Sequence, residues 1–175
     1  PPVFIQAADS LNASALGLLG NRVVILNSGI VEAMEPAELL SVLGHEFTHI
    51  KCHHTACAAF AGATHGLGVP YVSEVLGFIF GFWSRHAEHT ADRGALIASG
   101  SLNTTAAALA KLATGKNLFQ RFNLEHFLDQ QRDLTANELS KVSEMFQSHP
   151  SLVSRIHALR RFVTSPEYAR VQQSA

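Results

Sequence analysis

Hydrophobic and polar positions divide the chain into a short β-rich beginning and a long helical remainder. Val3–Ala7 and Arg22–Asn27 are apolar runs rich in β-branched residues, so both are predicted strands. Asn12–Ala15 and Gly17–Asn21, which lie between them, are expected to be turn or loop. A few strands followed by many helices predict an α+β fold in which helices dominate.

A helix is predicted to begin at Glu35-Pro36. Proline is favoured at the first helical position, and acidic side chains favour the positive end of the helix dipole. Apolar residues then recur at helical spacing, which indicates a buried face. We expect this helix to run to about Phe60, with an apolar face made of Leu39, Leu40, Val42, Leu43, Phe47 and Ile50.

Residues 56–83 are unusually apolar, and Thr55–Ser73 contains no charged residue. That length approaches a membrane span, but His65 and a cluster of glycine and proline residues interrupt it. Two interpretations stay open. One, which we favour, is a pair of buried core helices separated by a loop, and the other is a hairpin embedded in a membrane or lying against it. The second helix is expected to cover Val72–Ser99 and to stop at Gly100.

Further helices are expected towards the C-terminus. Thr104–Thr114 is rich in alanine and leucine, Asn117–Asp133 is helical or irregular, and Thr135-x-x-Glu138 has the pattern of a capping box. The last predicted helix starts at Pro150 or Ser151 and carries Leu152, Ile156, Leu159 and Phe162 at helical spacing.

The length and the net charge of the chain limit the number of domains and the kind of partner. A chain of 175 residues suits one compact domain, so residues 1–175 are interpreted as a single domain. Charged residues make up only 15% and the formal net charge is −1, which gives no electrostatic argument for nucleic acid as a partner. The start, Pro1-Pro2, has no initiator methionine and no basic segment before an apolar core. We interpret the chain as an excised domain that could have lost flanking segments.

The histidines and cysteines indicate what kind of site and which compartment to expect. Six of the ten histidines fall in two short clusters, which points to a metal site: His45, His49, His53, His54, His86 and His89. His53 is expected to cap the helix or face solvent. Cys52 and Cys57 lie on different faces of one predicted helix, so we expect small core residues and no disulfide. This favours a reducing compartment, with the chain cytoplasmic or associated with a membrane.

His45-Glu46-Phe47-Thr48-His49 has the pattern H-E-x-x-H. Positions i and i+4 share one helix face, so both imidazoles can bind one zinc ion. Glu46 lies about 100° further round the helix, where it can accept a proton from water whose pKa the metal lowers to about 7. The alternative is a chance match with solvent-exposed side chains. The apolar flanks argue against it, because buried polar groups need partners and a metal provides one.

A catalytic zinc ion has three protein ligands and an open position. Residues 84–93 are predicted to supply the third ligand, Glu88, while Asp92, one helical turn later, would accept the free N–H of a ligand histidine. The alternative is a solvated face of alternating charge, which the apolar residues on both sides disfavour. His86 and His89 are rival ligands, although His89 points about 100° away from Glu88.

The pattern H-E-x-x-H followed by S-R-x-x-E-x-x-A-D at residues 84–92 resembles the gluzincin zinc metallopeptidases, which include the HtpX heat-shock protease and the CAAX prenyl endopeptidase. Other elements resemble that family in the same order, so the resemblance extends over about residues 3–160. They are Asn12-Ala13, Val24–Val31, Glu38-Leu39, Val42–Gly44, His149-Pro150 and Arg155-Ile156.

The resemblance implies a zincin-like catalytic domain with a small N-terminal β-sheet and an H-E-x-x-H helix. It also implies an edge strand, here near Arg22–Asn27, that pairs with an extended or unfolded polypeptide substrate. His149 and Arg155 would face the active site, polarise the scissile carbonyl and stabilise the oxyanion. The alternatives are an ordinary helix-start residue for His149 and an ion pair with Asp92 or Glu88 for Arg155.

Two functions stay open. The first is a zinc metalloendopeptidase with Glu46 as general base, and the second is a zinc-stabilised peptide-binding module without turnover. A structural zinc site fits poorly, because such sites are usually closed by four ligands rich in cysteine. Membrane-bound members of the family carry transmembrane hairpins, and the short separation of His49 from Glu88 favours a soluble or peripheral form. Membrane association is therefore compatible with the sequence but not required.

Overall fold

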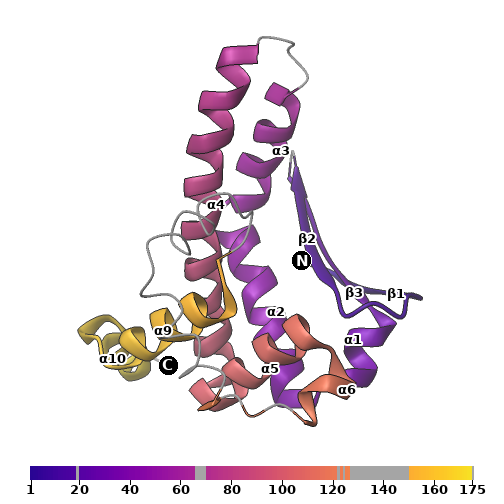
Figure 1. Ribbon diagram of the computed structural model, residues 1–175, viewed down its shortest axis with the longest axis vertical. Coiled ribbons are helices and arrows are strands. Elements are labelled where there is room, and N and C mark those ends of the chain that lie inside the picture. Colours follow the sequence, from indigo (N-terminus) through magenta and orange to yellow (C-terminus); the bar gives the residue numbers. More distant parts are fainter. Residues whose placement is uncertain (19, 66–69, 122, 124, 127–149, 175) are drawn as a thin grey trace.

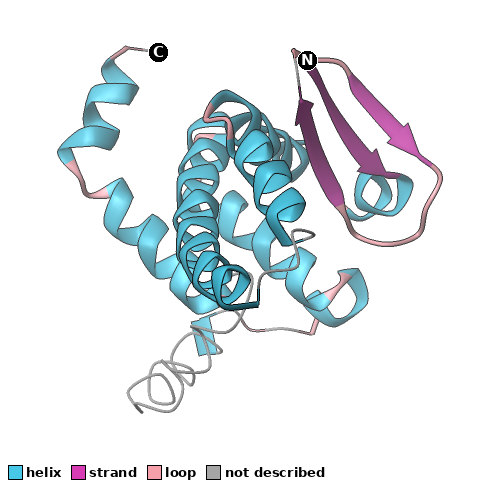
Figure 2. Cartoon of the chain, turned by 90° about the horizontal axis from the view of Figure 1, so that it is seen from above, coloured by secondary structure: helices cyan, strands magenta, loops and turns pink. Residues whose placement is uncertain are grey.

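The computed structural model describes residues 1–18, 20–65, 70–121, 123, 125–126 and 150–174. A small three-stranded sheet stands beside a larger group of helices (Figure 1). Seen from above, the sheet forms a separate layer to one side of the helices (Figure 2). The expected α+β fold, mainly helical, is confirmed.

The sheet contains β1 (Val3–Gln6), β2 (Ala13–Leu18) and β3 (Asn21–Asn27) in the order β1-β3-β2. β1 runs parallel to β3, and β2 runs antiparallel to it. The two predicted strands are confirmed as β1 and β3, but the expectation of turn or loop across the residues of β2 is wrong. Its residues, mostly alanine, glycine and serine, have weak strand propensity, and pairing with β3 supplies the order that local sequence lacks.

The strand order also corrects the predicted substrate strand. β3 was expected to be an edge strand, yet it lies in the centre of the sheet with both neighbours paired. Its side chains Val24 and Leu26 are buried. The edges of the sheet are therefore β1 and β2, and β2 is the edge beside the helix that carries the H-E-x-x-H pattern.

That helix is α2 (Pro36–Lys51), which follows the short α1 (Ser28–Ala33). It begins as predicted, with Pro36 in the first turn and a capping box in which the Glu38 carboxylate accepts from the backbone N–H of Glu35 at 2.8 Å. The expected apolar face is only partly correct. Val42 and Ile50 are buried, whereas Leu40 and Phe47 are 49% and 37% exposed.

α2 ends at Lys51, earlier than the predicted Phe60, and α3 (His54–His65) starts after a two-residue break. His53 in the break has φ of 59°, the left-handed region that side chains other than glycine seldom adopt. No glycine or proline marks this position in the sequence, so the pattern alone predicted a continuous helix.

α3 and α4 (Pro70–Ser99) form a hairpin that extends beyond the rest of the molecule (Figure 1). α4 ends before Gly100, which has φ of 67°, as predicted. The interpretation as buried core helices is wrong for described side chains here, since Ile79 and Phe82 are 53% and 54% exposed. Cys52 and Cys57 are free thiols, as expected, but both are exposed and neither is a core residue.

No helix within the described part of the chain combines the length and the apolarity that crossing a bilayer would require.

α2 and α4 cross very closely. A Cβ on Gly94 would lie 1.8 Å from Thr48 Oγ1, and one on Gly44 would lie 2.5 Å from the Ala98 Cβ. The Thr48 hydroxyl donates to the Gly44 carbonyl at 2.8 Å, so it needs no partner on α4. Glycine on both helices therefore permits the close approach that brings the metal-binding faces together.

The remaining described helices close the core. They are α5 (Leu102–Thr114), α6 (Lys116–Phe119), α9 (Leu152–Val163) and α10 (Pro166–Gln173). α5 and α9 agree with the predicted helices. Of the expected positions on α9, Ile156, Leu159 and Phe162 are buried with Leu96 of α4, and Leu152 is partly buried against them. The predicted capping box at Thr135 and most of Asn117–Asp133 lie outside the described residues.

Candidate metal centre

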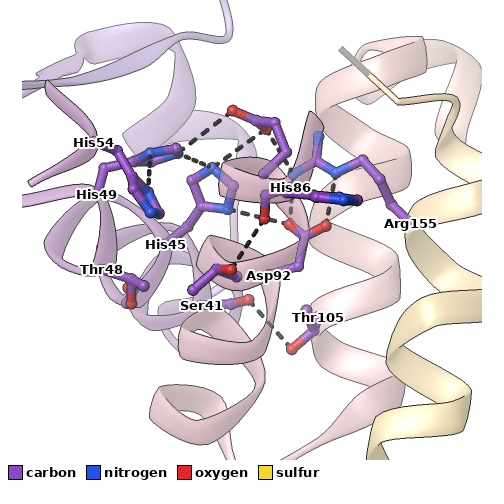
Figure 3. Close-up of polar contacts among 12 residues, drawn as sticks. Ser41, His45, Thr48, His49, His54, His86, Asp92, Thr105 and Arg155 are labelled. Atoms are coloured by element: carbon purple, nitrogen blue, oxygen red, sulfur yellow. Dashed lines mark hydrogen bonds and ion pairs between the residues drawn. The ribbon is translucent and has the colours of Figure 1, made fainter. Parts of the chain in front are cut away.

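Three ligand atoms converge where α2 faces α4 (Figure 3). Nε2 of His45 and Nε2 of His49 lie 3.0 Å apart. The Glu88 carboxylate lies 3.6 Å from Nε2 of His45 and 3.4 Å from Nε2 of His49. The i, i+4 spacing on α2 and the crossing with α4 thus place two imidazoles and one carboxylate for metal binding, as the sequence predicted.

The donor set suits a metal ion better than a network of hydrogen bonds. Two ring nitrogens that face each other at 3.0 Å can share only one proton between them. A cation placed among the two nitrogens and the Glu88 carboxylate would use all three lone pairs and offset the buried negative charge. The residues present therefore fit a metal ion.

Asp92 contacts the ring nitrogen of His45 that does not face the cluster. Its Oδ1 lies 3.1 Å from Nδ1 of His45, and its side chain is 1% exposed. A proton on Nδ1 leaves the lone pair on Nε2, which is the atom that faces His49 and Glu88. Asp92 thus contacts Nδ1 of a candidate ligand histidine, and its role in fixing the tautomer stays a prediction.

Arg155 of α9 contacts the carboxylates of Glu88 and Asp92 on α4. Its Nε and Nη2 donate to Asp92 at 2.8 and 2.5 Å, and Nη2 lies 3.5 Å from Glu88 Oε2. This is the ion-pair alternative left open by the sequence. Burial raises the pKa of Asp92, but its bonds to Arg155 and His45 outweigh that effect and hold the pKa below its ordinary value.

Glu46 is buried beside the ligand cluster and reaches across to the sheet. The backbone N–H of Ala15 in β2 donates to its carboxylate. Burial raises the pKa of Glu46, and the nearby Glu88 carboxylate adds to the rise, while His45, His49 and the Ala15 bond oppose it. A carboxyl with a raised pKa holds a proton more readily than one in water, which suits a group that accepts and returns protons.

His54 also belongs to the site, although no role there was predicted for it. Its Nδ1 lies 3.1 Å from Nδ1 of His49, on the side of that ring opposite Nε2 (Figure 3). The Trp83 ring of α4 packs edge-on against it, with centroids 5.6 Å apart. The clustering of histidines was the available signal, but their spacing predicted no contact, because the prediction assumed an unbroken helix.

The rival ligands lie apart from the cluster. His86 is exposed and packs on Phe82, and His89 is only half-buried. The Nδ1 of His89 has no hydrogen-bond partner among the described residues. Burial lowers the pKa of His89, an effect that Asp92 opposes. His149, the second predicted oxyanion group, lies outside the described residues.

A cleft of about 1120 Å³ opens over the metal-binding side chains. Its lining comes from β2, β3, α2, α3, α4 and α5, together with Arg155 of α9. β2, an edge strand of the sheet, thus lines the same cleft as α4. An extended chain entering this cleft would therefore pass between a strand edge and the convergent ligands.

Comparison with known proteins identifies relatives of the whole chain. The family model described as Peptidase family M48 matches residues 1–163. The chain is 26% identical to the plastoglobule-localized metallopeptidase 48, chloroplastic, of Arabidopsis thaliana, with 100% of this chain and 55% of that protein covered. It is 29% identical to a protease HtpX homolog of Moorella thermoacetica, with 97% and 69% covered. It is 30% identical to protease HtpX of Erwinia tasmaniensis, with 97% and 68% covered. The chain thus spans between about half and two thirds of the length of these relatives.

Proposed function

The chain belongs to peptidase family M48, and from this premise we propose that it is a zinc-dependent endopeptidase. One observation carries the proposal: His45, His49 and Glu88 converge beside the buried carboxylate of Glu46. They do so in a cleft with a free strand edge along one wall. The names of the relatives, metallopeptidase 48 and protease HtpX, agree with this reading.

Zinc is the metal that this ligand set favours. Two imidazoles and one carboxylate with an open fourth position form a typical catalytic zinc site, whereas calcium and magnesium prefer oxygen ligands alone. His45, His49 and Glu88 would hold the ion. When bound, zinc supplies Lewis acidity, which lowers the pKa of a coordinated water and polarises a carbonyl.

Glu46 is the proposed general base. Its carboxylate accepts a proton from the attacking water and later returns that proton to the leaving amine nitrogen, so hydrolysis leaves the enzyme unchanged. Its buried position and raised pKa support both steps. Its bond with the N–H of Ala15 fixes the carboxylate between α2 and the strand beside which the substrate would lie.

Asp92 and Arg155 act as positioning residues in this proposal. Asp92 orients His45 through Nδ1, and Arg155 orients Asp92 and approaches Glu88. Stabilisation of the oxyanion by Arg155 would require the guanidinium to reach the substrate while it keeps these bonds. His149 stays a proposed oxyanion group on the strength of the family resemblance.

β2 replaces β3 as the proposed substrate-pairing strand. The N–H of Ala15 points to Glu46 and the carbonyl of Gly17 accepts from Thr55, so both face away from β3. Alternate residues of a strand direct their backbone groups to the same side, so the backbone groups of Ala13, the carbonyl of Ala15 and the N–H of Gly17 share this edge and are the ones proposed to pair with a substrate. An extended polypeptide is the substrate class that such an edge can hold.

Substitution of Glu46 by glutamine tests the reaction. Glu46→Gln should bind one equivalent of zinc as the parent does but cleave an unfolded protein such as casein about 10²–10⁴-fold more slowly, the usual contribution of a general base. Glu32→Gln, an exposed carboxylate on α1, is the matched control and should cleave at the parental rate.

The alternative function, a peptide-binding module without turnover, predicts a different result. The parent protein with saturating zinc would then bind extended peptides and release no product. Equal cleavage by the parent and by Glu46→Gln would likewise refute the proposed mechanism. Location in a reducing compartment, cytoplasmic or at a membrane, stays a prediction from the cysteines.

Peptide substrates with modified backbones can test whether the substrate pairs with β2. N-methylation of single amides in a cleaved peptide should lower kcat/KM by up to about tenfold at alternate positions near the scissile bond, because each lost hydrogen bond contributes about 1 kcal/mol. Methylation at the intervening positions should have little effect. Equal losses at every position, measured by product formation, would count against pairing with β2.

A further inference from the structure

His49 has a partner on the side of its ring that faces away from Glu88. We propose that His54 is a positioning residue for the metal centre, and that it orients His49 and fixes its tautomer for metal binding. This rests on the proposed function, since it assumes that His49 binds a metal. The observation behind it is the 3.1 Å distance between Nδ1 of His54 and Nδ1 of His49.

The contact determines which nitrogen carries each proton. His49 directs Nε2 towards His45 and Glu88, so that nitrogen must offer its lone pair to a metal. The proton of the neutral ring then lies on Nδ1, from which it is donated to His54. His54 must accept through Nδ1 and therefore carries its own proton on Nε2.

The two ligand histidines thus have parallel supports. Asp92 accepts a hydrogen bond from Nδ1 of His45 at 3.1 Å, and His54 accepts one from Nδ1 of His49 at 3.1 Å. Partners of this kind orient ligand rings and raise their basicity. The two supports differ in charge, because a carboxylate holds one ring and a neutral imidazole holds the other. The site therefore gains a second oriented ligand without another buried negative charge.

The break between α2 and α3 makes the contact. In a continuous helix, His54 would lie five residues after His49 and therefore about 140° round the axis, too far for the two rings to meet. The left-handed turn at His53 changes the chain direction and returns His54 to the ligand ring. The strained backbone is thus located where it completes the metal centre.

α4 holds His54 from its other side. The Trp83 ring stands nearly perpendicular to the His54 ring, with an interplanar angle of 86° and centroids 5.6 Å apart. His54 is half-buried between this ring and His49, whose centroid is 5.1 Å away. α4 therefore supplies both the ligand Glu88 and the side chain that supports His54.

The test separates hydrogen bonding from packing. His54→Phe keeps a ring against Trp83 but cannot accept a hydrogen bond from His49, whereas His54→Asn keeps an acceptor near the position of Nδ1. His86→Phe, at an exposed histidine of α4, is the control. Zinc affinity is measured by competition with a chromophoric chelator. In the cobalt-loaded proteins, the shifted signal of the exchangeable ring proton of His49 is recorded by NMR.

We expect His54→Phe to bind zinc about 10–100-fold more weakly, the usual effect of removing such a partner, and to lose the slowly exchanging ring proton. His54→Asn should restore most of the affinity and the signal, and His86→Phe should match the parent. If phenylalanine prevents folding, His54→Ala, which adds no bulk, is measured in its place with the same expected loss.

Parental affinity together with an intact ring-proton signal in His54→Phe, or in His54→Ala, would overturn the proposal. Equal weakening by Phe and Asn would also overturn it, because packing alone would then explain the effect. Failure of the proposed function has a different signature. A parent protein that binds zinc but cleaves no peptide refutes the peptidase, while the affinity series still decides the role of His54.

Discussion

At the scale of single residues, the buried contact between Asp92 and Arg155 decides how the site responds to acid. Asp92 is 1% exposed, yet its pKa is held below the ordinary value because Arg155 and His45 outweigh the cost of burial. A carboxyl whose folded pKa is lowered stabilises the fold above its unfolded pKa, about 3.9. That contribution is lost as the pH falls through the lower, folded pKa.

Asp92→Asn should therefore be less stable than the parent in metal-free protein at pH 7. Removing one partner leaves the Arg155 charge buried, which costs about 3–5 kcal/mol. The difference should shrink as the pH falls below about 4, because the unfolded carboxyl takes up a proton there while the folded one does so only at a lower pH. Urea unfolding with a chelator present, at several pH values, measures both effects.

Glu125→Gln is the control for this experiment, because Glu125 forms an exposed ion pair with Arg160. Exposed pairs contribute little, so its stability should follow that of the parent at every pH. A constant difference between Asp92→Asn and the parent across the acid range would contradict the assigned ionisation.

At the scale of elements, the crossing of α2 and α4 sets the distance between the ligands. His45 and His49 belong to one helix and Glu88 to the other, so helix separation controls whether a metal can be bound. The separation depends on Gly44 and Gly94, where Cβ atoms would meet the opposite helix. The stretch of sequence that carries the chemistry is thus also a packing surface.

Gly94→Ala should weaken both the fold and metal binding. The new Cβ would lie 1.8 Å from Thr48 Oγ1, and overpacking of this kind costs about 1–3 kcal/mol. Shifting α4 away from α2 would also move Glu88 from the two imidazoles. Thermal unfolding and zinc titration of the variant measure the two losses.

Gly81→Ala, in the same helix, is the matched comparison. Apart from its chain neighbours and the backbone of its own helix, the nearest described atom to the new Cβ is Arg85 Nη1 at 3.7 Å, an ordinary contact distance. The substitution should therefore stabilise the helix by about 0.5–1 kcal/mol. Equal changes in stability and zinc affinity in the two variants would show that helix propensity, and not the close crossing of α2 and α4, explains the effect of substituting Gly94.

At the scale of the whole molecule, the metal centre joins segments that are far apart in the sequence. α2 supplies two candidate ligands, α4 supplies the third, and α9 supplies Arg155, which contacts Asp92. A metal ion that binds only the folded chain stabilises all of these contacts together. At a free concentration 1,000 times its Kd, the gain is about 4.1 kcal/mol.

Zinc should accordingly raise the melting temperature of the parent, and chelation should reverse the rise. Glu88→Ala should lose most of this effect, whereas His89→Ala should keep it, because His89 lies outside the ligand cluster. Thermal scans with and without zinc, together with calorimetric titration, measure the difference. A larger loss in His89→Ala than in Glu88→Ala would refute the choice of ligand.

The sequence by itself determined what depends on residues close together in the chain. The i, i+4 spacing placed His45 and His49 on one helix face, and the same rule placed Glu88 and Asp92 together on another. Helix starts and stops also followed local chemistry, such as Pro36 at the beginning of α2 and Gly100 after α4. These features were predictable because backbone geometry repeats within a single element.

Tertiary structure alone decided what depends on contacts between elements. Residues 13–18 have weak strand propensity and form β2 because they pair with β3. As a result β2, and not β3, is the edge strand that lines the cleft. The left-handed turn at His53 places His54 against His49. The packing of α9 places Arg155 where it forms an ion pair with Asp92. Local spacing cannot reveal such contacts, because their free energy comes from surfaces that meet only when the chain has folded.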